Sequence, residues 1–124
     1  MAVSFTLLVL LLSVTVDGGR IFLSYIAVRD AAEEGALHGS LNPTDSAGIE
    51  SRVRTNSTTP VNLAVTGTVT VSSQLLGAAC AGNGIKVTVT HTINLTMPFI
   101  STILGNSTIP LTAVSTATIL RPPC

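Results

Sequence analysis

The chain has no tryptophan, and aromatic residues make up only 3% of its 124 residues, although 46% of the residues are hydrophobic. A free-standing soluble core of this size usually contains more large aromatic side chains. The apolar content consists instead of Val, Ile, Leu and Ala, concentrated at the front of the chain and in later alternations with Thr. The length fits one compact domain together with one anchoring element.

Charge is also scarce. Charged residues are 10% of the chain, six basic against six acidic, so the net charge is zero. A soluble domain usually carries about a quarter of charged residues. This composition lacks the broad basic surface that nucleic-acid binding needs, so we expect no nucleic-acid partner. A net charge near zero favours association, which a protein that polymerises can tolerate.

The usual signals of chemistry are missing as well. His38, which is expected to end a helix, and His91, which we expect to face water on a strand, do not supply the three or four convergent ligands of a zinc site. The chain contains no G-x-S-x-G nucleophile elbow, and Glu33 and Glu34 point about 100° apart on a helix. The Gly-rich stretch 77–84 lacks the lysine of a phosphate-binding loop. We therefore predict no catalytic residue, no metal or cofactor site, and no enzyme activity.

The two cysteines, Cys80 and Cys124, are either unrelated thiols or one disulfide. The disulfide is favoured because the other features of the chain indicate a location outside the cytoplasm. Such a bridge would tie Cys124 to the loop 77–84. In the loop-entropy estimate it would contribute roughly 4 kcal/mol to stability.

Residues 1–16, MAVSFTLLVLLLSVTV, contain no charge and predict a membrane helix. The apolar character resumes after Arg20, so a tilted span can reach Val28. Asp17 and Arg20 lie three residues apart, would face each other on the helix, and are predicted to form an ion pair. No basic residue precedes Arg20, so the basic n-region of a secretory signal is missing. We expect Met1 to begin a processed chain, with an unprocessed start as the alternative.

The helical pattern continues through the Ala-rich stretch 27–37 and should stop around Gly39, before Pro43. Residues 1–38 are thus expected to form one helix nearly 60 Å long, which needs lipid or copies of itself to cover its front half. Gly18 and Gly19 lie in its middle. They are a tolerated weak spot, a site of close packing against a neighbouring helix, or a hinge used during assembly.

The rest of the chain predicts a polar connector over residues 39–60, with a short helical turn around 47–53, and a β-rich head over residues 61–124. Residues 63–71 and 85–93 alternate apolar and hydroxyl side chains, as half-buried strands do, and 108–120 is a third such run. We expect an α+β fold, in which a small antiparallel sheet packs on the back half of the long helix. The stretch 97–105 is either a helical turn over the sheet or an exposed apolar patch for a neighbouring subunit.

Three N-x-S/T sequons, at Asn56, Asn94 and Asn106, are candidate glycosylation sites. Asn42 is excluded because a proline follows it.

The chain resembles the TadE-like pilins of tight-adherence (Flp-type) secretion systems, within the type IV pilin superfamily. Ala2-Val3-Ser4-Phe5, Asp17-Gly18-Gly19-Arg20 and Ala31-Ala32-Glu33-Glu34-Gly35-Ala36 match the family's N-terminal pattern in order and spacing. The C-terminal stretch 86–122 is similar to the family's ending, in which a strand, an apolar Pro-Phe segment and a Thr/Ala strand follow one another. The resemblance therefore covers nearly the whole chain.

The resemblance implies a structural pilin that forms a helical homo-oligomeric filament and buries residues 1 to about 28 of many copies in its core. It also implies cleavage by a prepilin peptidase, extraction from the cytoplasmic membrane by assembly machinery, and a final place in an extracellular, adhesive pilus. Met1, Ser4 and Phe5 form the expected N-terminal assembly region. Ser4 stands where the family usually has an acidic residue, so the charge attraction to a neighbour's terminal amine is lost. The alternative is a membrane-anchored extracytoplasmic binding or adhesion domain that does not polymerise.

Overall fold

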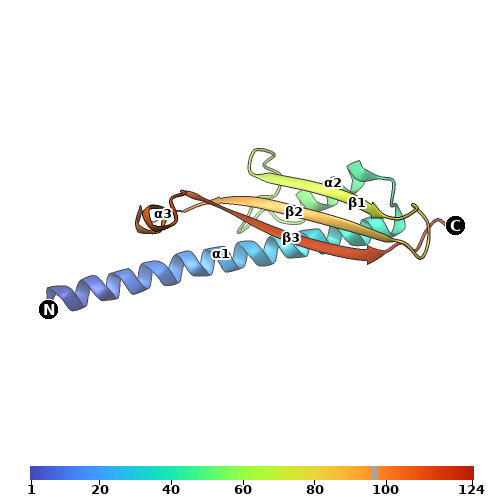
Figure 1. The fold of residues 1–124 in the computed structure, drawn as a ribbon. Coiled ribbons are helices and arrows are strands. Elements are labelled where there is room, and N and C mark those ends of the chain that lie inside the picture. Colours follow the sequence, from blue (N-terminus) through green and yellow to red (C-terminus); the bar gives the residue numbers. More distant parts are fainter. Residues whose placement is uncertain (96–97) are drawn as a thin grey trace.

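The computed structural model describes residues 1–95 and 98–124. The front half of the long N-terminal helix projects from the molecule (Figure 1). A sheet and a short helix cover the back half of the long helix and form the head. This is the α+β arrangement that the sequence predicts. In chain order the elements are α1 (Ala2–Leu41), α2 (Ser46–Thr55), β1 (Val69–Leu76), β2 (Gly84–Asn94), α3 (Pro98–Leu104) and β3 (Thr108–Thr118).

The sheet is antiparallel, with the strand order β1-β2-β3, and its strands run alongside α1 (Figure 1). The sequence located β2 and β3 to within one or two residues. Pro110 lies in β3, which is an edge strand of the sheet. An edge strand accommodates proline because its outer N–H positions need no partner strand.

The head packs on α1 through small side chains. Ala31, Ala32 and Ala36 are buried on the helix face that meets the sheet. A Cβ atom at Gly35 would lie 2.6 Å from Val53 Cγ2, and one at Gly39 would lie 2.8 Å from Ile85 Cδ1. The absence of these side chains lets the branched residues of α2 and β2 lie directly against the helix backbone. The remaining core consists of Ala27, Val28, Ile49, Val53, Val61, Leu63, Val69, Ile85, Val87, Val89, Ala113 and Ile119.

Helix α1 continues past the predicted stop at Gly39 and ends at Leu41. His38 lies in its last turn, as expected, and its Nε2 is 3.0 Å from Asp45 Oδ2. Asp45 also caps α2, because its Oδ1 accepts a 3.0 Å hydrogen bond from the backbone N–H of Gly48. The hydrogen bonds from His38 and Gly48 lower the pKa of Asp45. One carboxylate thus joins the end of α1 to the start of α2.

The first predicted strand, over residues 63–71, is wrong in position, because β1 begins only at Val69. Leu63 is buried but Val65 is 45% exposed, so the alternation does not correspond to one buried face. Residues 63–68 form turns instead, and hydrogen bonds from Arg54 of α2 stabilise these turns. The Arg54 guanidinium donates to the backbone carbonyls of Leu63 at 3.3 Å and Val69 at 3.4 Å. The helical turn expected within the connector is the ten-residue α2.

The predicted disulfide between Cys80 and Cys124 is confirmed. It joins the loop between β1 and β2 to the end of the chain. Backbone hydrogen bonds reinforce this link, since the N–H of Ala81 donates to the Pro122 carbonyl at 2.7 Å and the N–H of Leu120 donates to the Ser40 carbonyl at 2.8 Å. The C-terminal tail is therefore held against both the loop and the end of α1.

Within the stretch 97–105, residues Pro98–Leu104 form the helix α3, and Met97 lies outside the described residues. Figure 1 places α3 beyond the ends of β2 and β3, beside the front half of α1, so it does not cover the sheet. Ile103 and Leu104 are 84% and 56% exposed. The segment is helical, as the first alternative expected, but it does not lie over the sheet. Ile103 and Leu104 are exposed, and their contact with a neighbouring subunit stays a prediction.

Candidate assembly surface

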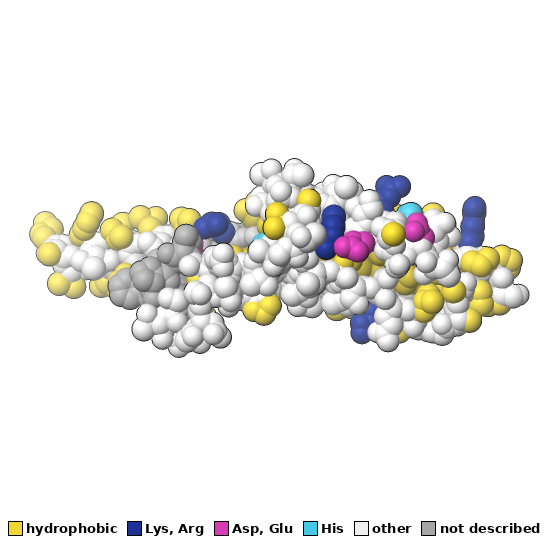
Figure 2. All heavy atoms as spheres, turned by 90° about the horizontal axis from the view of Figure 1, so that it is seen from above, with side chains coloured by type: hydrophobic (Ala, Val, Ile, Leu, Met, Phe, Trp, Pro, Cys, Tyr) yellow, Lys and Arg dark blue, Asp and Glu magenta, His cyan; other side chains and the backbone are white. Residues whose placement is uncertain are grey.

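The front of α1 stands clear of the head as a bare apolar rod, which we define as residues 1–16. Every residue of the rod except Ser13 is exposed, and the first buried residue of α1 is Asp17. Figure 2 shows hydrophobic side chains and no charged ones along the projecting end on this face. The exposed large apolar side chains of the rod are Met1, Val3, Phe5, Leu7, Leu8, Val9, Leu10, Leu11, Leu12, Val14 and Val16.

Among the described residues, α1 is the one helix whose length and composition suffice to cross a membrane. Its best 18-residue window has a mean hydropathy of 1.8, and 6% of that window is buried by the rest of the chain. The rod is about 24 Å long, slightly less than a hydrocarbon core of roughly 30 Å. The chain therefore carries a candidate membrane anchor at its N-terminal end.

Two hydroxyl groups of the rod are satisfied within the helix itself. Thr6 Oγ1 and Thr15 Oγ1 each donate a 2.8 Å hydrogen bond to the backbone carbonyl four residues earlier. Such bonds let hydroxyl side chains lie in apolar surroundings without an external partner. The residues of the expected N-terminal assembly region, Met1, Ser4 and Phe5, are all exposed on the same rod.

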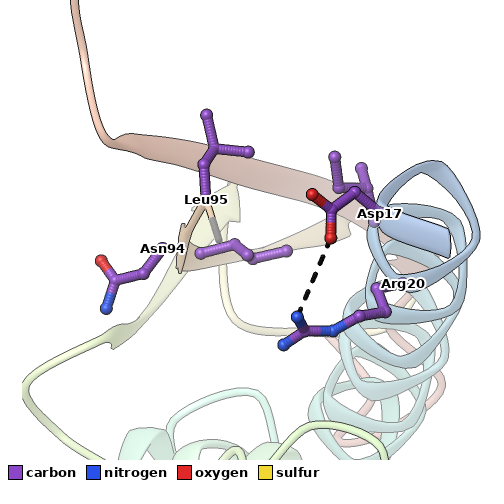
Figure 3. Close-up of a pocket in the computed structure, with 6 residues that line it drawn as sticks. Asp17, Arg20, Asn94 and Leu95 are labelled. Atoms are coloured by element: carbon purple, nitrogen blue, oxygen red, sulfur yellow. Dashed lines mark ion pairs between the residues drawn. The ribbon is translucent and has the colours of Figure 1, made fainter. Parts of the chain in front are cut away.

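The rod meets the head at Asp17 and Arg20. Arg20 Nη1 lies 4.0 Å from Asp17 Oδ1, the pairing that the three-residue spacing predicts. The Asp17 side chain is 11% exposed and that of Arg20 is 61% exposed. Figure 3 shows the Asp17 carboxylate beside the end of β2, where Asn94 and Leu95 lie, together with the ion pair. The carboxylate thus marks the point at which the head begins to cover α1.

The helix runs unbroken through Gly18 and Gly19. Apart from the helix's own nearby backbone, no atom of the described residues lies within 4 Å of the position that a Cβ would take at either residue. Packing within the subunit therefore does not require glycine at these positions. The hinge and the close approach of a neighbouring helix both stay predictions.

His91 does not face water as the sequence analysis expected. It lies on the same face of β2 as Val87 and Val89, which is the face that packs on α1. Burial lowers the pKa of the imidazole, and Nδ1 is buried without a hydrogen bond to any described residue. The signal was present in the sequence, because His91 falls in phase with the apolar residues of the alternation.

His91 lines a cavity of about 390 Å³ that lies between α1, the loop before β1 and the end of β2. A second cavity of about 220 Å³ adjoins it and shares the lining residues Leu23 and Pro60. Both cavities lie beside α1 between Arg20 and Asp30, and we call the two together the α1 groove. Sequence reasoning missed this groove, because the turns of the loop before β1 form its outer wall.

The three sequon asparagines are exposed and do not come together in one site. Asn56 follows α2 and lines the α1 groove. Asn94 ends β2, and the third residue of its sequon, Thr96, lies outside the described residues. Asn106 lies between α3 and β3.

No group of three His, Cys, Asp or Glu side chains within residues 1–95 and 98–124 could hold a metal ion. The candidate functional feature of this geometry is a surface. It consists of the bare rod, the junction at Asp17 and the adjoining α1 groove. Comparisons with protein-family models, with curated proteins and with solved structures give no match.

Proposed function

We propose that this chain is the structural subunit of an extracellular Tad-like, type IV pilus filament and polymerises through the front half of α1. In this proposal the subunit lies in the cytoplasmic membrane before assembly. A prepilin peptidase and the pilus assembly machinery are its partners there. The chain acts as a building unit and catalyses no reaction.

The observation that carries the proposal is the bare rod. Eleven large apolar side chains of residues 1–16 are exposed in the isolated subunit. Complete burial of such a side chain contributes about 1.5–3 kcal/mol, so covering the rod is worth on the order of 20 kcal/mol. The head cannot cover these side chains, because its contact with α1 begins only at Asp17. Lipid supplies it before assembly, and sister subunits supply it in a filament.

The continuity of α1 supports a filament rather than a tethered domain. The same helix forms the rod and, from Ala27 to Gly39, contributes the buried face on which the rest of the head packs. No loop separates the rod from the head, so the position of the rod fixes the position of the head. A regular filament needs this fixed relation, whereas a membrane-tethered binding domain can do without it.

Surface filaments sheared from cells that produce the chain provide the first test. Electron microscopy combined with mass spectrometry should identify this chain as the filament subunit, and N-terminal sequencing would test peptidase processing. If the chain occurs only as a membrane-embedded monomer, the non-polymerising anchored domain replaces this proposal.

A truncation that removes residues 1–16 provides the second test. It deletes the rod and leaves every buried residue of α1 in place. We expect a water-soluble monomer that retains the Cys80–Cys124 disulfide and forms no filaments. A truncated chain that still polymerises would show that assembly does not depend on the rod.

A further inference from the structure

We infer that the α1 groove of each subunit is a docking site for the bare rod of a neighbouring copy. This inference rests on the proposed function and specifies which part of the head contacts the rod. It is argued from the length, the lining and the charge of the two surfaces.

The groove has no occupant from the described parts of its own chain, and its lining mixes apolar side chains with polar ones, among them Ser24, Asn62, Thr68 and His91. Leu23 and Ile26 of α1 form one side and are 53% and 38% exposed. Pro60 and Val65 of the loop before β1 form the other side, and Val65 is 45% exposed. A helix that carries large, partly exposed apolar residues beside an open groove still has apolar surface to bury.

The rod of a second copy is long enough to span the groove, and both surfaces have little charge. The groove extends over residues 20–30 of α1, about 15 Å, and the rod is about 24 Å long. Arg20 and Asp30 lie at the two ends of the groove, and its lining between them carries no Asp, Glu, Lys or Arg. The rod carries no charged side chain either. An uncharged helix can therefore fill the groove without burying an unpaired ion.

The packing geometry of helices allows this contact. Two helices pack when a ridge of side chains four residues apart on one enters a groove on the other. The rod presents two such ridges, Leu7 with Leu11 and Leu8 with Leu12, and all four side chains are more than half exposed. Residues four apart are about 6 Å apart along the axis, so the groove accommodates two or three of them.

The groove also continues the surface of the rod of its own subunit. Leu23 and Ile26 belong to α1, as the rod does. A neighbouring helix that packs along the rod therefore reaches the groove without changing direction. This continuity favours a second copy over an unrelated partner.

Engineered cysteine pairs in the full-length chain test the contact. Cys80 and Cys124 are bonded to each other, so introduced cysteines provide the free thiols. One cysteine replaces Val65 in the groove. The second replaces, in separate variants, each of four successive rod residues, which together sample every face of the helix: Leu7, Leu8, Val9 and Leu10.

The matched control places the groove cysteine at Val114 instead. Val114 is 54% exposed, close to the 45% of Val65, but it lies in β3 on the sheet face opposite α1. After oxidation of sheared filaments, we expect disulfide-linked dimers through Val65→Cys with at least one rod position. Their yield should exceed that of the Val114→Cys pairs by at least about tenfold, because docking raises the local thiol concentration.

A charge in the groove provides an independent measurement. Val65→Asp should reduce the yield of filaments by at least about tenfold, since docking would bury an unpaired carboxylate, whereas Val114→Asp should leave the yield within about twofold. The Cys80–Cys124 disulfide and the unfolding midpoint of both variants show whether the head has folded.

The outcomes separate the two proposals. If filaments form and Val65→Cys gives no more crosslinking than Val114→Cys, the groove is not the docking site, and the pilin proposal stands. Normal filament yield from Val65→Asp leads to the same conclusion. If the unaltered chain forms no filaments, both proposals are wrong.

Discussion

Substitution of Gly35 by alanine should destabilise the head, although alanine is the better helix former. A Cβ at this position would lie 2.6 Å from Val53 Cγ2 and 3.2 Å from Val87 Cγ1. Both neighbours are β-branched and fully buried, so neither can rotate away without disturbing the core. The perturbation therefore adds one methyl group where α1, α2 and β2 meet.

Two opposing effects set the magnitude. Replacing a helical glycine by alanine stabilises a helix by up to about 1 kcal/mol. Forcing an extra methyl into a packed core costs about 1–3 kcal/mol. We expect the cost to exceed the gain, so that Gly35→Ala lowers the free energy of unfolding by up to about 2 kcal/mol.

Two further glycines of the same helix serve as controls. At Gly39 the closest atom to a new Cβ would be Ile85 Cδ1, at 2.8 Å, which is the end of a flexible side chain. Gly39→Ala should therefore be less harmful than Gly35→Ala. At Gly19 no atom of the described residues outside the helix's own backbone lies within 4 Å of a new Cβ, so Gly19→Ala should be neutral or stabilising.

Urea unfolding of the full-length chain in a non-ionic detergent, followed by proteolysis of the unfolded fraction, would give the three free energies. The expected order of stability is Gly19→Ala above Gly39→Ala above Gly35→Ala. If Gly35→Ala proves as stable as the unaltered chain, the close contact between α1 and Val53 is not a feature of the native head.

Two more predictions concern the head. Arg54→Ala should cost about 1–3 kcal/mol in the same unfolding assay, because the carbonyls of Leu63 and Val69 lose their donor. Arg52→Ala should cost under about 1 kcal/mol, since the Arg52 guanidinium forms an exposed 3.7 Å ion pair with Glu34, and equal losses would contradict the role assigned to Arg54. Burial lowers the pKa of His91 below 6.5, so as the pH falls the imidazole is protonated in the unfolded chain before it is protonated in the folded chain. The contribution of His91 to the free energy of unfolding should therefore be fully present above pH 6.5 and decrease as the pH falls below it. His91→Gln should remove that part of the decline when unfolding midpoints are compared at pH 7.5 and 5.5, and an identical decline in both chains would show that His91 does not contribute.

The sequence was sufficient for the parts of the fold that depend on composition and period. The uncharged run up to Val16 and the Ala-rich stretch after it predict one long helix, which α1 is. The alternation of Val and Thr in 85–93 locates β2, because every second residue there is buried or partly buried against α1. The disulfide followed from a count of two cysteines and the expected compartment.

The sequence failed where contacts distant in the chain decide the structure. Residues 63–71 alternate as cleanly as a strand, but Arg54 binds the carbonyls of Leu63 and Val69 and stabilises turns instead. Gly39 looked like a helix stop, yet its role is to let Ile85 approach the backbone of α1. Local propensity shows neither the turns nor the continued helix, because the first depends on Arg54 of α2 and the second on Ile85 of β2.

The candidate site divides in the same way. The rod and the Asp17–Arg20 spacing can be read directly from the sequence. The α1 groove cannot, since it exists only after the loop before β1 has folded beside Leu23. The orientation of His91 lies between these cases, because its phase within β2 indicated the correct face.

The strands and α1 lie side by side along the length of the molecule, and the two chain ends are at its opposite extremities (Figure 1). The covalent path between those extremities runs along the chain from Met1 to Cys80 and then directly to Cys124 through the disulfide. Strands β2 and β3 lie inside the loop that this bond closes. Tension between the two chain ends would therefore bypass the hydrogen bonds between β2 and β3 as long as the disulfide is intact.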